Sequence, residues 1–228
     1  MADVSLSFSG QDFVPLPCGA LFWPGEQTLL VADLHLEKGS AFARQGWLLP
    51  PYDSLESLRR LAAAAAQVRP RHIVALGDSF HDSNGPSRLL PEALDLLLRL
   101  LRAHDWLWVT GNHDGDSGVE IGGRAVAEVE MAGIWLRHEA QTPSGGPEIS
   151  GHFHPKVAME LRAGVRVSRR CFAMAAERLV LPAYGAYAGG LSVDDPAFAV
   201  ALGCIPDAVV PLAGGIVRIP AAKRRNAA

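Results

Sequence analysis

Aspartate, asparagine and histidine recur in five short groups along this chain of 228 residues, and each group follows a hydrophobic run. In chain order the groups are Asp33-Leu34-His35, Gly77-Asp78, Gly111-Asn112-His113-Asp114, His138 and Gly151-His152-Phe153-His154. Imidazole, carboxylate and amide oxygen without thiolate suit Mn²⁺, Fe, Zn²⁺ or Ni²⁺ better than Ca²⁺ or Cu⁺. The residue types therefore indicate one polar site that holds a pair of divalent metal ions.

Two divalent metal ions held side by side support hydrolysis at phosphorus. One carboxylate can bridge ions that lie roughly 3.5–4 Å apart, which is the usual arrangement for in-line displacement. The two cations lower the pKa of a shared water and neutralise the phosphate oxygens. An isolated Asp-x-His, or His138 by itself, is more often an ordinary hydrogen-bonded polar pair. The five groups in order, each after an expected strand, favour the metal site.

The groups follow short apolar runs that are typical of buried strands. These runs lie at residues 28–32, 72–76, 106–110, 134–137 and 148–151. Loops at the carboxyl ends of strands in an open α/β sheet converge on one ligand site. Residues two apart on a strand point to the same side. We therefore expect Asp33 with His35, and His152 with His154, to present paired ligands.

Helices are expected between the first three of these strands. After a loop, one helix is expected to begin at Asp53 and to end before Pro70. Asp53 would cap this helix, with Glu56 as the reciprocal partner. The second begins at Pro91 and is rich in leucine. This alternation predicts a mainly parallel sheet. Beyond His113 short strand-like runs dominate.

The pattern predicts an α/β fold, a four-layer α-β-β-α sandwich of two packed mixed β-sheets with flanking helices. Further strands are expected at residues 4–8, 20–23, 125–130, 165–168, 179–181 and 216–219, with a short helix at 196–203. We expect a single catalytic domain over residues 1–220 and a flexible basic tail over residues 221–228, because AAKRRNAA has no apolar pattern.

The composition is that of an ordinary globular protein, with 49% hydrophobic and 20% charged residues. A net charge of -3 gives no general basic surface for nucleic acid. The three cysteines are widely spaced, so neither a disulfide framework nor a cysteine metal site is expected. No signal peptide or membrane-spanning run is evident. The sequence predicts a soluble, cytoplasmic protein that does not contact membranes.

The five groups in this order resemble those of the calcineurin-like metallophosphoesterase superfamily. The resemblance implies a first metal held by Asp33, His35, Asp78 and His154. It implies a second metal held by Asp78, Asn112, His138 and His152, with Asp78 bridging the two. His113 would stabilise the transition state or protonate the leaving oxygen while Asp114 orients it, and a hydroxide that bridges the metals would attack phosphorus.

Two further stretches, LLVADLHLEKG and RLVLPAYGAYAGGLSV, resemble the bacterial ligase-associated DNA-damage-response endonucleases. That resemblance implies two Mn²⁺ ions and phosphodiesterase activity. It also implies cleavage of single-stranded DNA in repair, in functional association with a DNA ligase, a helicase and an exonuclease.

Several residues outside the five groups could contact the substrate. His81 follows Asp78 closely and suits either a phosphate contact or an ordinary loop. Arg166 and Arg170 would share a face of a strand and suit phosphodiester oxygens, although a solvated face fits equally well. Tyr184 and Tyr187 could stack on bases or pack internally.

Two other functions remain compatible with the sequence. The first is hydrolysis of small nucleotides, cyclic or pyrophosphate-linked, because the fold does not choose the substrate. The second is a non-catalytic interaction domain that kept the fold. Such a domain usually lacks several ligands, whereas all the expected ligands are present in this chain.

Overall fold

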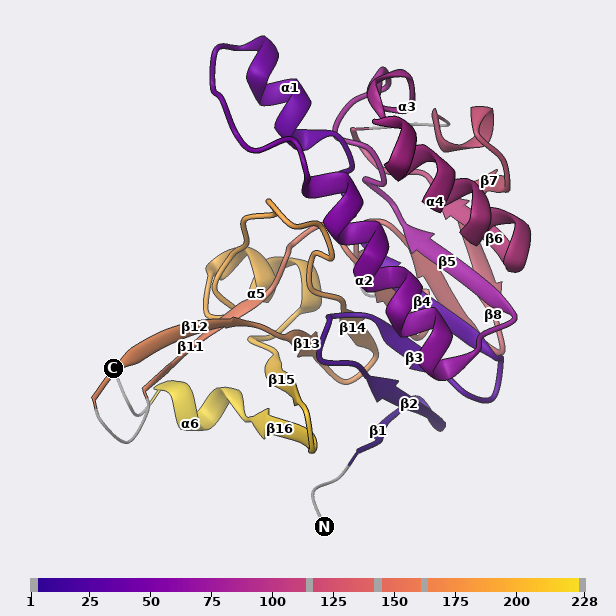
Figure 1. The fold of residues 1–228 in the computed structure, drawn as a ribbon. Coiled ribbons are helices and arrows are strands. Elements are labelled where there is room, and N and C mark those ends of the chain that lie inside the picture. Colours follow the sequence, from indigo (N-terminus) through magenta and orange to yellow (C-terminus); the bar gives the residue numbers. More distant parts are fainter. Residues whose placement is uncertain (1–3, 114–116, 142–144, 161–163, 226–228) are drawn as a thin grey trace.

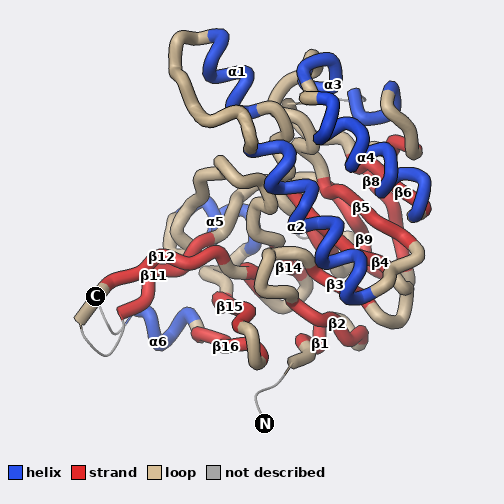
Figure 2. Tube along the Cα trace, viewed as in Figure 1, coloured by secondary structure: helices blue, strands red, loops and turns tan. Residues whose placement is uncertain are grey.

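The computed structural model describes residues 4–113, 117–141, 145–160 and 164–225. Two seven-stranded sheets pack face to face through a shared apolar layer. Helices α2 and α4 run side by side over the outer face of the first sheet (Figure 1, Figure 2). Helix α5 packs against the second sheet. The predicted four-layer sandwich is confirmed.

The first sheet has the order β1-β2-β3-β4-β5-β6-β7, with strands at Leu6–Phe8, Gln11–Pro15, Leu21–Trp23, Thr28–Ala32, His72–Leu76, Asp105–Val109 and Arg124–Val126. The second has the order β16-β15-β13-β14-β10-β9-β8. Its strands are β8 (Glu128–Met131), β9 (Ile134–Arg137), β10 (Glu148–Ser150), β13 (Phe172–Met174), β14 (Arg178–Val180), β15 (Asp207–Leu212) and β16 (Gly215–Ile219). Strands β11 (Lys156–Glu160) and β12 (Arg166–Arg170) form a separate two-stranded arm that projects from the body (Figure 1).

Within the described residues there are fewer helices than strands, and the longest helices are α2 with 16 residues and α4 with 13. Their bounds are Lys38–Arg44 for α1, Asp53–Val68 for α2, Gly85–Arg88 for α3, Pro91–Ala103 for α4, Pro196–Leu202 for α5 and Ala221–Arg225 for α6, with a 3-10 turn at Ser117–Glu120. None of the helices in the described ranges is long and apolar enough to cross a bilayer.

The central strand β4 is buried along its whole length because both of its faces are covered. Leu29 and Val31 face the layer under α2 and α4, whereas Leu30 faces the second sheet. A strand covered on both sides needs apolar residues at every position, which explains the uninterrupted run in the sequence. Strands β4, β5 and β6 are parallel neighbours, as the expected alternation of strands and helices requires.

The strand expected over residues 125–130 is wrong as a single element. Residues 124–126 form β7, which pairs with β6 in the first sheet, while β8 pairs with β9 in the second. The chain therefore passes from one sheet to the other at Ala127. Strands β2, β11, β13 and β15 were not expected, because they are short or interrupted by polar residues and proline.

The start of α2 differs from the expected capping box. Asp53 lies inside the helix, and its Oδ2 accepts a hydrogen bond from the backbone N–H of Gly39 (2.9 Å). The next residue, Ser54, donates its hydroxyl to Glu37 Oε1 (2.8 Å). These side chains fasten α1, which forms inside the expected loop, to the first turn of α2.

The C-terminal segment also differs from the expected flexible tail. Residues 221–225 form α6, and the buried guanidinium of Arg224 donates to the carbonyl oxygens of Ile219 (2.7 Å) and Pro206 (2.6 Å). Arg224 also pairs with Asp194 (2.8 Å). These bonds hold a segment whose sequence carries no apolar pattern of its own.

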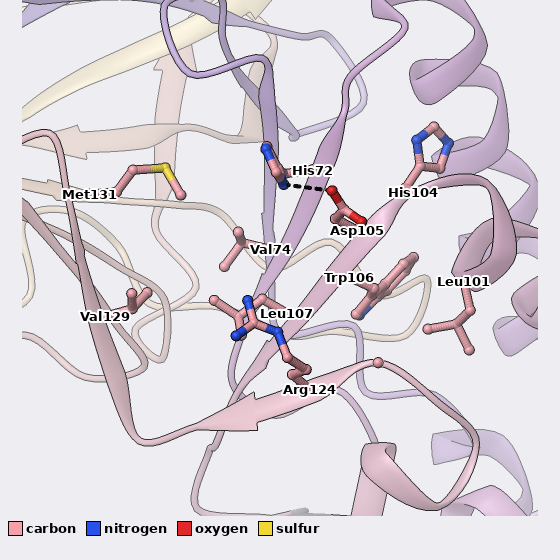
Figure 3. Close-up of a pocket in the computed structure, with 11 residues that line it drawn as sticks. His72, Val74, Leu101, His104, Asp105, Trp106, Leu107, Arg124, Val129 and Met131 are labelled. Carbon is pink, nitrogen blue, oxygen red and sulfur yellow. Dashed lines mark ion pairs between the residues drawn. The ribbon is translucent and has the colours of Figure 1, made fainter.

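The two ends of the first sheet differ in character. At the amino ends of β5 and β6, His72 and Asp105 form an ion pair (3.5 Å) beside a pocket that also contains Trp106, Arg124 and Met131 (Figure 3). The predicted metal ligands follow the opposite, carboxyl ends of the same strands. The pocket in Figure 3 is therefore separate from the predicted site.

A buried ion cluster supports the second sheet. Glu148 in β10 accepts from Arg137 in β9 (3.0 Å) and from Arg178 in β14 (2.9 Å). All three side chains are buried. Charges removed from water remain stable only while they are paired, so this cluster is sensitive to the loss of its shared carboxylate.

We expect Glu148→Ala to lower the free energy of unfolding by about 3–5 kcal/mol, because among the described residues it leaves the buried Arg178 without a carboxylate partner and Arg137 with Glu128 alone (3.1 Å). The matched control is Glu92→Ala, which removes an equally direct but exposed pair with Arg59 (2.6 Å) and should cost about 0–1 kcal/mol. Urea denaturation followed by circular dichroism measures both. Equal losses would contradict the role assigned to the cluster.

Candidate metal centre

The predicted ligands come together because the strands that precede them end at one edge. Ala32, Leu76 and Val109 are aligned as the last residues of β4, β5 and β6. In the second sheet β9 and β10 are also parallel neighbours. The residues that follow these five strands therefore meet where the carboxyl ends of both sheets approach each other.

Two compact groups of donor atoms result. We call them the Asp33 group, which consists of Asp33, His35 and His154, and the Asp78 group, which consists of Asp78, His138 and His152. Within each group the donor atoms lie within 4.8 Å of one another. Two residues of each group are buried and the third is partly buried.

In the Asp33 group three donor atoms point to one place. The Nε2 atom of His154 lies 3.3 Å from Nε2 of His35 and 3.4 Å from Oδ1 of Asp33. Burial, together with the neighbouring His154 and Lys38, lowers the pKa of His35 to about 2. A neutral imidazole has the free lone pair that a metal ion requires, so these donors fit a divalent cation.

The Asp78 group has the same character. Nε2 of His138 lies 3.2 Å from Nδ1 of His152 and 3.5 Å from Oδ2 of Asp78. The other ring nitrogen of His138 lies 3.1 Å from the carbonyl oxygen of Leu76 and 3.8 Å from Asp33 Oδ1. A metal-ligating histidine usually donates its other ring N–H to a backbone carbonyl or a carboxylate, and the carbonyl of Leu76 provides that partner for His138.

The expected strand alternation does not explain the paired ligands. Asp33, His35, Asp78, His152 and His154 all lie beyond the strand ends and have φ values of 42° to 69°. This left-handed region is uncommon for residues with side chains. Each such residue costs of order 1–3 kcal/mol, and such residues cluster at functional sites.

Backbone hydrogen bonds hold these residues in place. His35 donates its N–H to the carbonyl oxygen of Asp78 (2.8 Å), and Asp33 donates to that of Gly77 (3.2 Å). The carboxylates are held as well, since Asp78 Oδ1 accepts from the N–H of His113 (3.0 Å) and Asp33 Oδ2 from that of His152 (2.9 Å). The site is therefore organised by the backbone.

Three glycines give the side chains room. A Cβ atom on Gly77 would lie 2.1 Å from His138 Nδ1, and one on Gly111 would lie 2.2 Å from the backbone nitrogen of Asp78. A Cβ on Gly151 would lie 2.7 Å from Asp33 Oδ2. Only glycine allows so close an approach of backbone and ligand.

The remaining predicted residues lie around this centre. Asn112 is exposed and lines a surface hollow with His138 and Glu139. His113 is half exposed, with its Nε2 3.8 Å from Asp78 Oδ2. Asp114 lies outside the described residues.

The histidine whose role was left open, His81, lies against the centre. Its ring stacks on His113, with the ring centroids 5.7 Å apart, and on Phe42 of α1 at 5.6 Å. Its partly buried side chain has a lowered pKa, mainly because of burial and also because of the Lys38 charge. This environment favours the neutral form of the His81 imidazole.

The two predicted arginines lie on the arm and differ in their contacts. Arg166 is exposed near its tip. Arg170 is half-buried and donates to the carbonyl oxygens of Tyr184 (3.3 Å) and Gly185 (2.7 Å). Tyr184 itself is fully buried in the core and cannot stack on bases, while Tyr187 donates its hydroxyl to Pro50 O (2.8 Å).

The sequence analysis missed the residues that surround the centre from α1. Lys38 lies with its Nζ 5.9 Å from the ring centroid of Phe42. Burial lowers the pKa of Lys38, while the charges of Asp53 and Asp78 oppose that effect. The run Ser40-Ala41-Phe42-Ala43-Arg44 contains good helix formers and could have indicated this helix.

Comparison with known proteins identifies the family. A model of the calcineurin-like phosphoesterase family matches residues 27–157, more than half of the chain and all five groups. The chain belongs to this family. It is an enzyme, a metal-dependent phosphoester hydrolase, and the two groups of donor atoms are its candidate metal ligands.

Three solved structures align with this chain, and the first of them shares its architecture. The nuclease MPE of Pseudomonas putida aligns with a TM-score of 0.70 and 23% identity over 94% of this chain and 98% of its own. The E. coli phosphoesterase Yfce has a TM-score of 0.41 and 18% identity over 72% and 83% of the two chains. The Aquifex aeolicus protein AQ665 has a TM-score of 0.39 and 17% identity over 56% of this chain and 78% of its own. A search of curated protein sequences gives no match.

We expect Gly77→Ala to weaken metal binding by this phosphoesterase about 10- to 100-fold, because its Cβ would displace the His138 ring. Gly10→Ala is the matched control. Gly10 has φ 75°, close to the 74° of Gly77, but a Cβ there meets nothing within 4 Å.

Mass spectrometry of bound Mn²⁺ after dialysis at graded concentrations measures the effect, and circular dichroism checks that both variants fold. Equal metal affinity in the two variants would show that the approach of Gly77 to His138 does not control the site.

Proposed function

We propose that this phosphoesterase is a manganese-dependent phosphodiesterase that cleaves single-stranded DNA during repair. The observation that carries the proposal is the pair of three-residue donor groups beside the half-exposed His113, at an edge that reaches solvent. An open centre suits a polymer, of which one phosphodiester at a time can approach. The fold-level likeness to a structure described as a nuclease supports the same class of substrate.

The metal ligands that we propose are those of the two donor groups, with Asn112 added to the Asp78 group. Bound divalent ions supply an activated water and offset the charge of the phosphate. Asp78 is the proposed bridging carboxylate, and its fixed orientation through the His113 N–H keeps Oδ2 turned toward His138. Manganese is proposed from the subfamily resemblance, because the donor atoms also suit Fe, Zn²⁺ and Ni²⁺.

His113 is the proposed group that protonates the leaving oxygen. Its backbone is tied to Asp78, while its ring is half exposed and can reach a substrate. Asp114 would orient His113, as the resemblance implies. His81, stacked against the same ring, is the proposed phosphate contact.

The arm offers a second proposed contact. Arg166 is exposed and can meet a phosphodiester backbone, whereas Arg170 would act indirectly, by shaping the loop at Tyr184 and Gly185. From the subfamily resemblance we also propose a cytoplasmic enzyme that works alongside a DNA ligase, a helicase and an exonuclease.

Metal-stripped protein should be inactive, and added Mn²⁺ should restore cleavage of both single-stranded DNA and bis-p-nitrophenyl phosphate. Asp78→Ala should remain inactive on both, because it removes a ligand that we assign to two ions. Asp105→Ala, at the opposite end of β6, is the matched control and should stay active.

A matrix of metals against substrates, with cyclic and pyrophosphate-linked nucleotides included, measures these outcomes. Turnover of a nucleotide without any turnover of DNA would replace our proposal with the small-nucleotide alternative.

His113→Ala should bind Mn²⁺ but lose roughly 100- to 10,000-fold in kcat on DNA, the usual contribution of general acid catalysis. The loss should be smaller on bis-p-nitrophenyl phosphate, because nitrophenolate leaves without a proton. His72→Ala, outside the centre, is the control and should match the unsubstituted protein. An equal loss on both substrates would rule out proton transfer as the role of His113.

A further inference from the structure

The loop between α1 and α2 exposes a cluster of large apolar side chains. Trp47 is 69% exposed, Leu48 89% and Tyr52 62%, and Leu49 lies between them. Large apolar groups scattered singly over a surface need no explanation, whereas a contiguous exposed group marks a binding surface. We call these four residues the apolar loop. In Figure 1 the segment extends beyond the rest of the molecule past α1.

The backbone of the apolar loop is held although its side chains face solvent. The N–H of Trp47 donates to the carbonyl oxygen of Phe42 (3.0 Å), and the N–H of Leu49 donates to that of Trp47 (3.1 Å). From outside the loop, Tyr187 donates its hydroxyl to Pro50 O (2.8 Å). A surface whose backbone is fixed before binding loses less conformational entropy when a ligand arrives.

A row of three rings leads from the metal centre to α1, and its last member, Phe42, is joined to the apolar loop by a backbone hydrogen bond. The ring of His113 stacks on His81, and His81 stacks on Phe42, with interplanar angles of 17° and 29°. Phe42 is the residue whose carbonyl oxygen holds Trp47. Flat faces therefore follow one another from the candidate catalytic residue outward along α1.

Positive charges lie beside these rings, and the carboxylate of Asp82, next to His81, is paired with Arg88 (2.8 Å). Arg44 lies in the last turn of α1, is exposed, and forms no ion pair within the described residues. Lys38 lies near the Phe42 ring at the other end of the helix. The nearby carboxylates of Glu37 and Asp53 are buried. The surface thus offers aromatic faces with cations between them, which is the combination that proteins use for single-stranded nucleic acid.

We propose that the apolar loop is a platform on which the unpaired bases of the substrate strand stack, with Trp47 and Tyr52 as the stacking rings and Arg44 against the phosphate backbone. This inference rests on the function proposed above and adds the surface that selects single strands. A duplex hides the faces of its bases, whereas an unpaired strand presents them to any exposed ring.

The test compares a short oligothymidylate with an abasic oligonucleotide of equal length. We expect the unsubstituted protein to have the lower KM for the strand with bases. In Trp47→Ala/Tyr52→Ala the KM for oligothymidylate should rise by about 5- to 150-fold, the change that corresponds to about 1–3 kcal/mol of stacking, and the preference for bases should be lost. Trp47→Phe/Tyr52→Phe retains the rings and should retain the preference.

Val200→Ala is the matched control, since Val200 on α5 is also an exposed apolar side chain, at 79%. Retention of the base preference by the double alanine variant would overturn the platform and leave the nuclease proposal intact. Hydrolysis of bis-p-nitrophenyl phosphate without any DNA cleavage by the unsubstituted protein would overturn both. Light scattering shows whether the unsubstituted protein forms an oligomer. If the double alanine variant loses that oligomer but keeps the base preference, the surface binds a second copy of the chain and the platform is overturned.

Discussion

The carboxylate of Asp33 connects the two sheets at the edge where the donor atoms meet. Asp33 follows β4 in the first sheet, and its oxygens accept the backbone N–H of His152, which follows β10 in the second. Because the group is fully buried, it requires hydrogen bonds and positive charge to remain stable as an anion. The carboxylate that joins the loops of the two sheets is thus also a member of the Asp33 group of candidate donor atoms.

The same edge concentrates backbone strain. Side chains that follow a strand normally continue its alternation, but here the left-handed conformation of Asp33, His35 and Asp78 turns them toward one point. Hydrogen bonds between neighbouring loops offset this strain, such as the one from Gly185 N to Asp33 O (3.1 Å). The strained residues cannot relax to ordinary backbone conformations, because hydrogen bonds join each of their loops to a loop at another strand end. The site is therefore preorganised.

Helix α1, which lies beside the centre, is also held in place by hydrogen bonds. Glu37, two residues after His35, donates its N–H to the hydroxyl oxygen of Ser54 (2.7 Å) at the start of α2. Helix α1 therefore has a fixed position beside the candidate donor atoms, and its outer end reaches solvent. A fold does not choose its substrate, so the exposed α1 region and the arm are where selection among phosphoesters can arise.

Much of this architecture follows from local patterns. The uninterrupted apolar runs predicted β4 and β5 at their observed bounds and β6 within one residue, because strands covered on both faces exclude polar residues. The polar groups after them predicted which side chains would meet. Elements without such a pattern were missed: β13 has only three residues, β15 is interrupted by Pro211, and residues 125–130 divide between the two sheets at Ala127.

The sequence by itself determined the inventory of donor atoms, their order and the strands that carry them, because residue type and hydrophobic period are local properties. Only the tertiary structure decided that left-handed backbone aims these donors, and that Asp53 fastens α1 instead of capping α2. It also decided that Tyr184 is buried while Trp47 is exposed. The reason is physical: those outcomes depend on contacts between segments far apart in the chain, and no local pattern records them.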